Sequence, residues 1–149
     1  MNMLSHSFDD YNAHVEHLVR HFPLDVAMCK AIGCPDLEQF RITGDGQVAV
    51  LKHHGLKDGM SVYDLGCGSG RTAQALYRSG WKGHYRGADI IQKLVEYLNG
   101  QCPGYGAVVN RSLSIVAPDD SLDLVFHWAS SLTCSSRNPT SSCRTRSGR

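Results

Sequence analysis

The feature that most constrains the fold is the stretch SVYDLGCGSGRTAQAL at residues 61–76. A short apolar run ends in Asp64, three glycines then alternate with small residues, and a pattern with helical spacing follows. Glycines in a strand-to-helix turn tolerate positive φ and let a ligand approach the backbone without an intervening Cβ. The helix N-terminus adds unpaired N–H groups and a partial positive charge. The stretch therefore predicts a strand, a ligand-binding turn and a helix.

Strand and helix patterns alternate along the rest of the chain. Upstream, the pattern predicts helices over residues 9–32 (broken at Pro23), 36–40 and 45–54, the last ending at Gly55. From residue 61 it predicts a strand at 61–65, a helix at 70–79, a strand at 84–90, a helix at 91–100, an apolar strand at 105–109 and a strand at 121–128. Such alternation indicates an α/β fold with a Rossmann-like parallel sheet, and we expect flanking helices on both faces.

The spacing of the glycines distinguishes between possible ligands. A dinucleotide fingerprint reads G-x-G-x-x-G and a phosphate loop reads G-x-x-x-x-G-K-[ST], whereas residues 64–70 read D-x-G-x-G-x-G without a following lysine. Asp64 would repel a pyrophosphate but suits a ligand with an ammonium or sulfonium group. Asp89 ends the next predicted strand, where an acid can bind both hydroxyls of a ribose. Together the two acids indicate a positively charged nucleoside.

These residues resemble the class I S-adenosylmethionine-dependent methyltransferases, from about Gln47 to Trp128. The resemblance implies that Asp64–Gly70 wraps the methionine and ribose portions of S-adenosylmethionine, that Asp89 holds the ribose hydroxyls and that Ile90 lies against the adenine. The segment PDDSLDLVFHW resembles the family's fourth strand, whose end faces cofactor and substrate. The cofactor-binding residues implied in this way are Asp64, Leu65, Gly66, Cys67, Gly68, Gly70, Asp89, Ile90, Ser112 and His127.

The sequence departs from the family pattern after the third predicted strand. The family often has an acid there near the adenine amino group, whereas residues 109–113 read VNRSL. Asn110 or Ser112 would have to supply that hydrogen bond. The family's sheet has seven strands, and this sequence offers about four.

The composition changes after Leu132. Residues 133–149 contain no Leu, Ile, Val, Met or aromatic residue, so we expect disorder. Because the genetic code is degenerate, this segment could be encoded by DNA that, in a shifted reading frame, encodes a sequence with the apolar spacing of a helix. Our hypothesis is an out-of-frame tail on a truncated methyltransferase, and an intact genomic frame would contradict it. The predicted divisions are a helical segment at 1–55, a partial cofactor-binding core at 56–132 and a tail at 133–149.

Two functions follow, and the sequence leaves both open. The first is methyl transfer from S-adenosylmethionine to a small molecule. The second is a truncated fragment that binds the cofactor without activity. No catalytic residue is identified, because Cys67 has no evident base and His127 fits a general base and a pocket wall equally well. Tyr11 and Asn12 are interpreted as ordinary packing rather than as a lid.

Charge and cysteine content exclude other classes. The net charge of +1 gives no electrostatic case for nucleic acid or an anionic membrane, and no apolar run reaches the length of a membrane span. Six cysteines without a CxxC pair favour neither disulfides nor zinc, and His14, His17 and His21 are interpreted as a solvated helix face. The start of the chain does not resemble a secretory signal, so we expect a cytoplasmic protein. A truncated sheet would also expose a strand edge and favour self-association.

Overall fold

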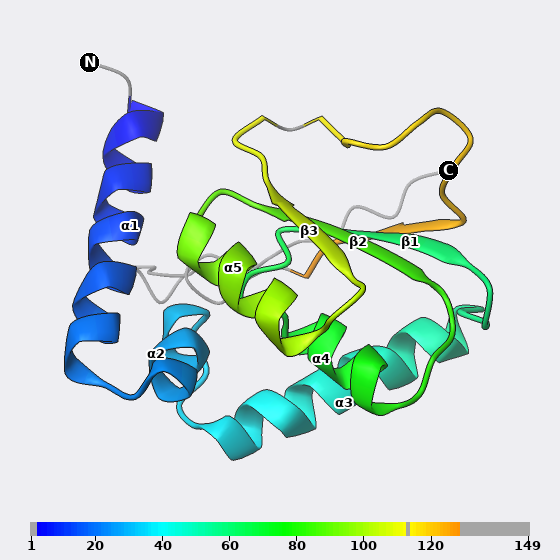
Figure 1. The fold of residues 1–149 in the computed structure, drawn as a ribbon, viewed down its shortest axis with the longest axis horizontal. Coiled ribbons are helices and arrows are strands. Elements are labelled where there is room, and N and C mark those ends of the chain that lie inside the picture. The colour runs from blue at the N-terminus through cyan, green and yellow to red at the C-terminus, as the bar shows by residue number, and fades with distance from the viewer. Residues whose placement is uncertain (1–2, 113, 129–149) are drawn as a thin grey trace, which may run out of the picture.

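The computed structural model of the chain describes residues 3–112 and 114–128. The elements in chain order are α1 (Met3–His21), α2 (Leu24–Ala31), α3 (Leu37–His53), β1 (Ser61–Leu65), α4 (Arg71–Arg78), β2 (His84–Asp89), α5 (Gln92–Gln101), β3 (Gly106–Val109) and β4 (Leu124–Phe126). The four strands form one parallel sheet in the order β3-β2-β1-β4 (Figure 1). This arrangement confirms the predicted α/β fold. The predicted tail at 133–149 lies outside the described residues.

The prediction of separate helices at 36–40 and 45–54 is wrong, because α3 is continuous through both. Asp36 caps the helix by accepting a hydrogen bond from the Gln39 amide at 2.8 Å. Gly44, which lies between the two predicted helices, is where α3 packs closely on α4. A Cβ at Gly44 would lie 2.6 Å from the carbonyl oxygen of Arg71. The glycine therefore serves helix packing and does not end the helix.

The main core lies between one face of the sheet and helices α3, α4 and α5. Val62 on β1, Tyr85 on β2 and Ala107 on β3 supply the sheet side of this core. Leu51 of α3 and Leu98 of α5 are among the buried residues that meet them. Because α3 shares this core, the segment 1–55 does not pack as a body separate from the sheet.

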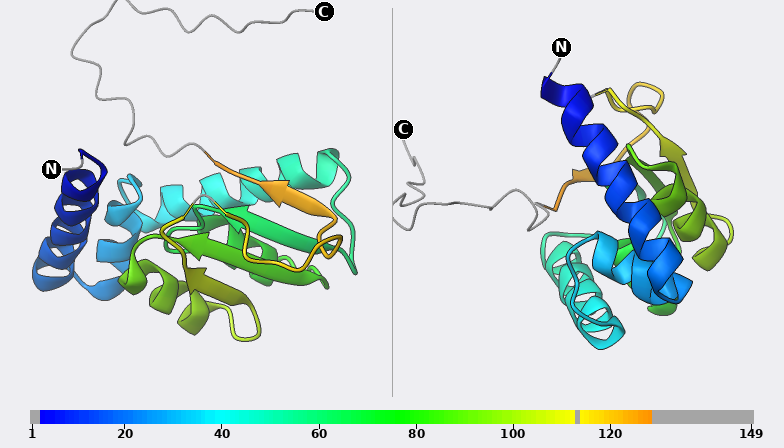
Figure 2. Two further views of the ribbon diagram at one scale, coloured as in Figure 1. Left: turned by 90° about the horizontal axis from the view of Figure 1, so that it is seen from above. Right: turned by 90° about the vertical axis from the view of Figure 1, so that its left-hand side faces the viewer.

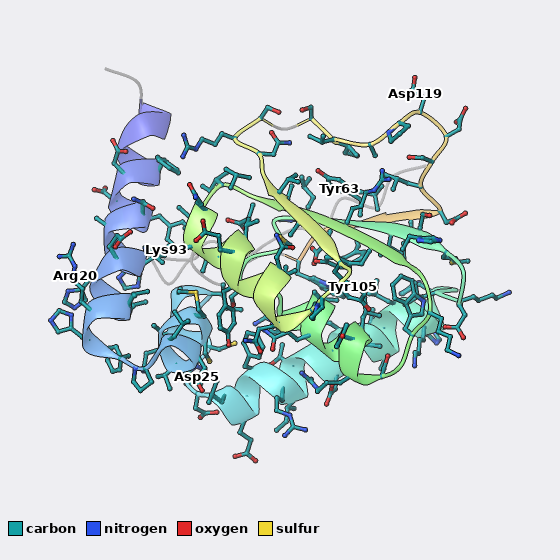
Figure 3. The ribbon with its side chains drawn as sticks, viewed as in Figure 1. Arg20, Asp25, Tyr63, Lys93, Tyr105 and Asp119 are labelled. Carbon is teal, nitrogen blue, oxygen red and sulfur yellow. The ribbon has the colours of Figure 1, made fainter. Side chains whose placement is uncertain are left out.

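Helices cover only one face of the described sheet, which corrects the expectation of helices on both faces (Figures 1 and 2). The chain moves from β1 to β2 to β3 in one direction and then returns past β1 to β4. Since parallel crossovers are right-handed, the return must run over the opposite face. The described residues of that connection form no helix, and its Val116 amide donates to the hydroxyl of Tyr63 at 3.3 Å. Figure 3 shows Tyr63 on the same side of the sheet as Asp119 of the connection.

The reversal of strand order lies between β1 and β4, where the carboxyl ends of the strands leave a crevice. Helices α1 and α2 pack at this end against the start of α5, through a second buried cluster that includes Val15, Met28 and Leu94. Tyr11 of α1 ties the two helices together by donating to the carbonyl of Ala31 at 3.1 Å. The N-terminal helices therefore form a wall beside the switch point. Among the described residues, no helix is both long and apolar enough to cross a membrane.

Candidate functional site

A cavity of about 730 Å³ opens at the carboxyl ends of β1, β2 and β4. Its volume is typical of small-molecule sites, which span roughly 300–1,000 Å³. The lining residues come from α1, the glycine turn, the start of α4 and the strand ends: Asp10, Tyr11, His14, Ile32, Gln47, Asp64, Leu65, Gly66, Cys67, Gly68, Arg71, Thr72, Ala88, Asp89, Ile90, Asn110, Ser112, His127 and Trp128. The fold thus brings together nine of the ten residues predicted to bind the cofactor.

Gly70 is the tenth, and it does not border the cavity. Its φ is +91°, and a Cβ at this position would lie 2.7 Å from Cγ of Leu98. Gly70 therefore lets α4 start close against α5. The structure shows a packing role for Gly70, and its contact with the cofactor stays a prediction.

Gly66 and Gly68 form the floor of the cavity in left-handed conformations, with φ of +80° and +55°. The amides of Gly66 and Cys67 both donate to the carbonyl of Ala88, at 2.8 and 2.9 Å, which fixes the turn to the end of β2. A Cβ at Gly68 would lie 3.0 Å from Ile32. The turn is therefore held in place by backbone bonds, and its two glycines add no side chain of their own to the cavity.

Asp89 is oriented by the same turn. Its Oδ2 accepts from the Gly68 amide at 2.9 Å and its Oδ1 from the Ile91 amide at 3.1 Å. Burial raises the pKa of the carboxyl, while these backbone bonds act in the opposite direction. A carboxylate has about four acceptor positions, so each oxygen keeps one for a further donor. A pair of ribose hydroxyls supplies two such donors.

Asp64 is 2% exposed, the most deeply buried acid of the cavity. Its Oδ2 accepts from the hydroxyl of Tyr85 at 2.8 Å, and its Oδ1 has no hydrogen-bond partner among the described residues. Burial raises the pKa of Asp64 to about 7, against the hydrogen bond from Tyr85. A buried carboxylate oxygen without a partner is stabilised by a hydrogen-bond donor, and a cationic N–H also offsets the negative charge of the carboxylate.

Cys67 is a packing residue of the turn. A Cβ at Gly87 would lie 2.9 Å from both Cβ of Cys67 and the Tyr85 hydroxyl, so Gly87 makes the room in which the two side chains lie. Burial raises the pKa of the Cys67 thiol far above its usual range. The thiol therefore stays protonated and is a poor nucleophile.

His127 follows β4 and lies over the turn. Its Nδ1 is 2.7 Å from the carbonyl oxygen of Leu65. Because a carbonyl only accepts, Nδ1 carries the hydrogen, and a neutral ring then keeps Nε2 as an acceptor. The sequence offered no partner for His127, and the structure supplies one through the pairing of β4 with β1.

Ile90, Asn110 and Ser112 mark the end of the cavity beyond Asp89. The Asn110 amide donates to the carbonyl of Asp89 at 2.9 Å, and Asn110 Oδ1 accepts from the Ser112 amide at 3.0 Å. The segment after β3 is therefore folded back beside Asp89 as a polar rim. Ile90 supplies an apolar surface that is 37% exposed.

Sequence reasoning missed Gln47, Arg71 and Thr72 as cavity residues. Arg71 and Thr72 directly follow the glycines, so their position in the sequence could have indicated that they border the site. No sequence feature indicated Gln47, because it reaches the site only through the packing of α3 on α4. Tyr11 and His14 also line the cavity, whereas Asn12 does not. The described residues contain no group of three or more side chains that could hold a metal ion. His14, His17 and His21 therefore do not form such a group.

The arrangement can hold a nucleoside that carries a cationic group. Asp89 offers acceptors to a ribose, Gly66 and Gly68 leave open backbone for close approach, and Asp64 offers a buried acceptor to a cation. No phosphate cradle is present among the described residues, because two carboxylates flank the turn. The donor set therefore fits S-adenosylmethionine better than a dinucleotide.

Comparison with known families and structures agrees with this geometry. The profile of the family described as "Methyltransferase domain" matches residues 62–144. No curated protein sequence gives a significant match.

Among solved structures, a SAM-dependent methyltransferase from Aquifex aeolicus is 24% identical with a TM-score of 0.53, covering 76% of this chain and 55% of that chain. A TehB-like SAM-dependent methyltransferase from Corynebacterium glutamicum is 22% identical with a TM-score of 0.52, covering 78% of this chain and 55% of that chain. The Haemonchus contortus phosphoethanolamine N-methyltransferase 1, solved with phosphoethanolamine and S-adenosylhomocysteine, is 18% identical with a TM-score of 0.52, covering 80% of this chain and 25% of that chain. At these identities the likeness shows the fold, and the chain spans about half the length of the first two structures.

Proposed function

Since this chain belongs to the methyltransferase domain family, we propose that it binds S-adenosylmethionine in the cavity at the switch point and transfers its methyl group. The observation that carries the proposal is the pair of carboxylates around the glycine turn. Asp89 is held by two backbone amides with acceptor positions to spare, and Asp64 has a buried oxygen without a partner. A cationic nucleoside satisfies both.

The residues of the chain act on this cofactor by holding it. Asp89 accepts from the ribose, the surface of Gly66 and Gly68 allows close approach, and Asp64 stabilises the positive charge. The bound cofactor supplies an electrophilic methyl group. Transfer to a nucleophile depends chiefly on positioning and on exclusion of water, so no dedicated base is required. His127 lines the cavity, and its Nε2 can accept a proton from a methyl-accepting substrate that must lose one.

We propose a small molecule as the methyl acceptor. The cavity volume of about 730 Å³ is that of a site for small ligands. Location in the cytoplasm stays a prediction of the sequence.

The second candidate function is cofactor binding without catalysis. The observation that favours it is that the acceptor oxygens of Asp64 and Asp89 account for binding of the cofactor, whereas no catalytic residue is identified. Both candidates require the same cofactor site. The two candidates differ in whether bound S-adenosylmethionine is converted to S-adenosylhomocysteine. A turnover assay with a panel of small methyl-accepting molecules distinguishes them.

Isothermal titration calorimetry with S-adenosylmethionine and S-adenosylhomocysteine tests the cofactor site. We expect Asp89→Asn to weaken both ligands at least tenfold, because each lost hydrogen bond to a charged acceptor is worth about 1.5–3 kcal/mol. Gly68→Val should abolish binding, since φ of +55° and a Cβ contact at 3.0 Å disfavour any side chain. Asp119→Asn, on the connection away from the cavity, is the matched control and should bind as the wild type does (Figure 3). Equal affinity in all four proteins would overturn the assignment.

A further inference from the structure

Cys29 and Cys34 lie together at the end of α2, in one buried cluster with Phe40. The Gly33 amide donates to the carbonyl of Lys30 at 3.0 Å and the Cys34 amide to that of Cys29 at 3.1 Å, with Gly33 at φ of +80°. This pair of bonds is a Schellman motif, in which the side chains at the two ends of the longer bond frequently pack on each other. The end of the helix therefore brings two thiols side by side that are not in a CxxC spacing.

Each of the two thiols also contacts a neighbouring helix. Cys29 Sγ donates to the carbonyl of Asp36 at 2.9 Å and lies 3.7 Å from the carbonyl oxygen of Cys34. Cys34 Sγ accepts from Nη1 of Arg71 at 3.2 Å. Because Asp36 caps α3 and Arg71 begins α4, the cysteine pair joins α2 to both of these helices.

The two thiols differ in exposure and in acidity. Cys34 is 5% exposed, whereas Cys29 is 1% exposed. Burial first, and then the neighbouring Cys34 thiol, raise the pKa of Cys29 to about 11. Cys29 therefore keeps its proton at neutral pH. We expect Cys34 to react first with an oxidant and Cys29 to supply the second sulfur.

We propose that Cys29 and Cys34 form a redox site, in which a hydroperoxide oxidises the two thiols to a disulfide and the new bond draws the Cys34 sulfur away from Arg71. Hydrogen peroxide transfers one oxygen to Cys34 Sγ, which gives a sulfenic acid and one water. Cys29 Sγ then attacks this sulfur: the S–S bond forms, the S–O bond breaks, and the oxygen leaves as a second water with the proton of the Cys29 thiol. Two electrons pass from the two sulfurs to the peroxide. A reducing thiol reverses the step by exchange.

Oxidation of this pair would act on the wall of the cavity. Ile32, which lies between the two cysteines in the chain, lines the cavity, as does Arg71. Ile32 also meets the glycine turn, since a Cβ at Gly68 would lie 3.0 Å from its Cγ2. The disulfide would constrain the segment that carries Ile32 and remove a hydrogen bond that orients the guanidinium of Arg71. This coupling rests on the proposed function, and we expect the oxidised protein to bind S-adenosylhomocysteine about threefold more weakly or worse, because a long side chain must then be ordered on binding.

Tryptic mapping of the oxidised protein tests the disulfide without reference to any ligand. Trypsin cleaves after Lys30 and so places the two cysteines on separate peptides, residues 21–30 and 31–41. After treatment with hydrogen peroxide and blocking of the remaining thiols with N-ethylmaleimide, mass spectrometry should show these peptides joined, and dithiothreitol should separate them. We expect this pair to be about tenfold or more as abundant as any other cysteine-linked pair, because adjacent thiols react at a high effective concentration.

Variants assign the two sulfurs. Cys29→Ala and Cys34→Ala should each abolish the joined peptides. Cys102→Ala, the matched control from the main core, should form them as the wild type does. Calorimetry with S-adenosylhomocysteine then compares the reduced and the oxidised wild type after removal of the peroxide, and dithiothreitol should restore the affinity of the oxidised form.

The outcomes separate the disulfide from the proposed function. If the wild type gives no joined pair, or gives chiefly links to Cys134 or Cys143, the redox site is overturned and the cofactor site stands. Equal affinity of the reduced and oxidised forms overturns the coupling to the cavity. If neither form binds S-adenosylhomocysteine, the proposed function fails and the coupling with it, while the joined peptides still decide the disulfide. The wild-type map decides it even if a variant does not fold, which its thermal unfolding curve would show.

Discussion

At the scale of single residues, Asp64 is the most unusual group of the molecule. It ends a buried strand and lies 2% exposed beside an aromatic hydroxyl, and one of its oxygens has no partner among the described residues. A carboxylate in this environment costs stability when it is charged. The charged form of Asp64 therefore destabilises the ligand-free protein, and the cation of the proposed ligand would offset this cost.

The pH dependence of stability should report this cost. The pKa of an aspartate in an unfolded chain is about 3.9, and in the folded protein burial raises that of Asp64 to about 7. Between these values the folded state holds a proton that the unfolded state has released. The free energy of unfolding therefore falls as pH rises from about 4 to about 7, by at most about 1.4 kcal/mol per pH unit.

Urea unfolding at pH 5 and pH 7.5 measures the effect. We expect Asp64→Asn to lose less stability than the wild type over this range, because its amide does not titrate. Asp119→Asn should follow the wild type. Parallel behaviour of the wild type and Asp64→Asn would show that Asp64 is charged at both pH values.

At the scale of elements, glycines decide how closely the helices meet. Gly44 lets α3 approach the first turn of α4, and Gly70 lets α4 approach Leu98 of α5. From the sequence, Gly70 was predicted to contact the cofactor and Gly44 had no assigned role. Their role is visible only when the second helix is in place.

Gly70→Ala should destabilise the protein by about 2 to 4 kcal/mol, because the new Cβ combines a left-handed φ of +91° with a contact 2.7 Å from Cγ of Leu98. Gly100→Ala is the matched control within α5, where an added Cβ meets nothing within 4 Å. It should be neutral or stabilising by roughly 0.5 to 1 kcal/mol. Chemical denaturation checks both changes, and similar effects of the two would refute the packing role.

For the whole molecule, one face of the sheet packs on helices, and among residues 3–112 and 114–128 the other face carries only the β3–β4 connection (Figure 2). Val108 on β3 and Val125 on β4 are 44% and 43% exposed. By strand alternation and register both lie on the face of Tyr63, opposite the helices. Exposed valines on edge strands favour association with another sheet.

We expect the protein to self-associate through this part of the sheet. Val125→Lys should shift a sedimentation velocity profile toward the monomer, because a charge on an edge strand opposes pairing. Val50→Lys, on the exposed side of α3 at 45% exposure, is the matched control and should leave the profile unchanged. A wild-type protein that stays monomeric at every concentration would contradict the expectation.

Much of the fold follows from local patterns. The strand at 61–65 appears with the predicted bounds, and helices α4 and α5 and strand β2 agree within about one residue, because their periodicity and glycine punctuation are local properties. The last strand is shorter than predicted, at Leu124–Phe126 within the expected 121–128, since pairing with β1 determines its extent. The prediction of separate helices at 36–40 and 45–54 is wrong, because α3 runs through both and packs against α4 at Gly44, a contact with a distant segment that local patterns do not show.

Local sequence specifies the parallel α/β arrangement, the glycine turn and the two acids that end neighbouring strands, because each depends on residues close together in the chain. Contacts in the folded chain show which oxygen of Asp64 lacks a partner, which carbonyl orients His127 and that Arg71, Thr72 and Gln47 line the same cavity. These features depend on the crossing of the chain from β3 to β4 and on the packing of α3 against α4. Contacts between distant segments leave no periodic signal in the sequence, so they become visible only in the folded molecule.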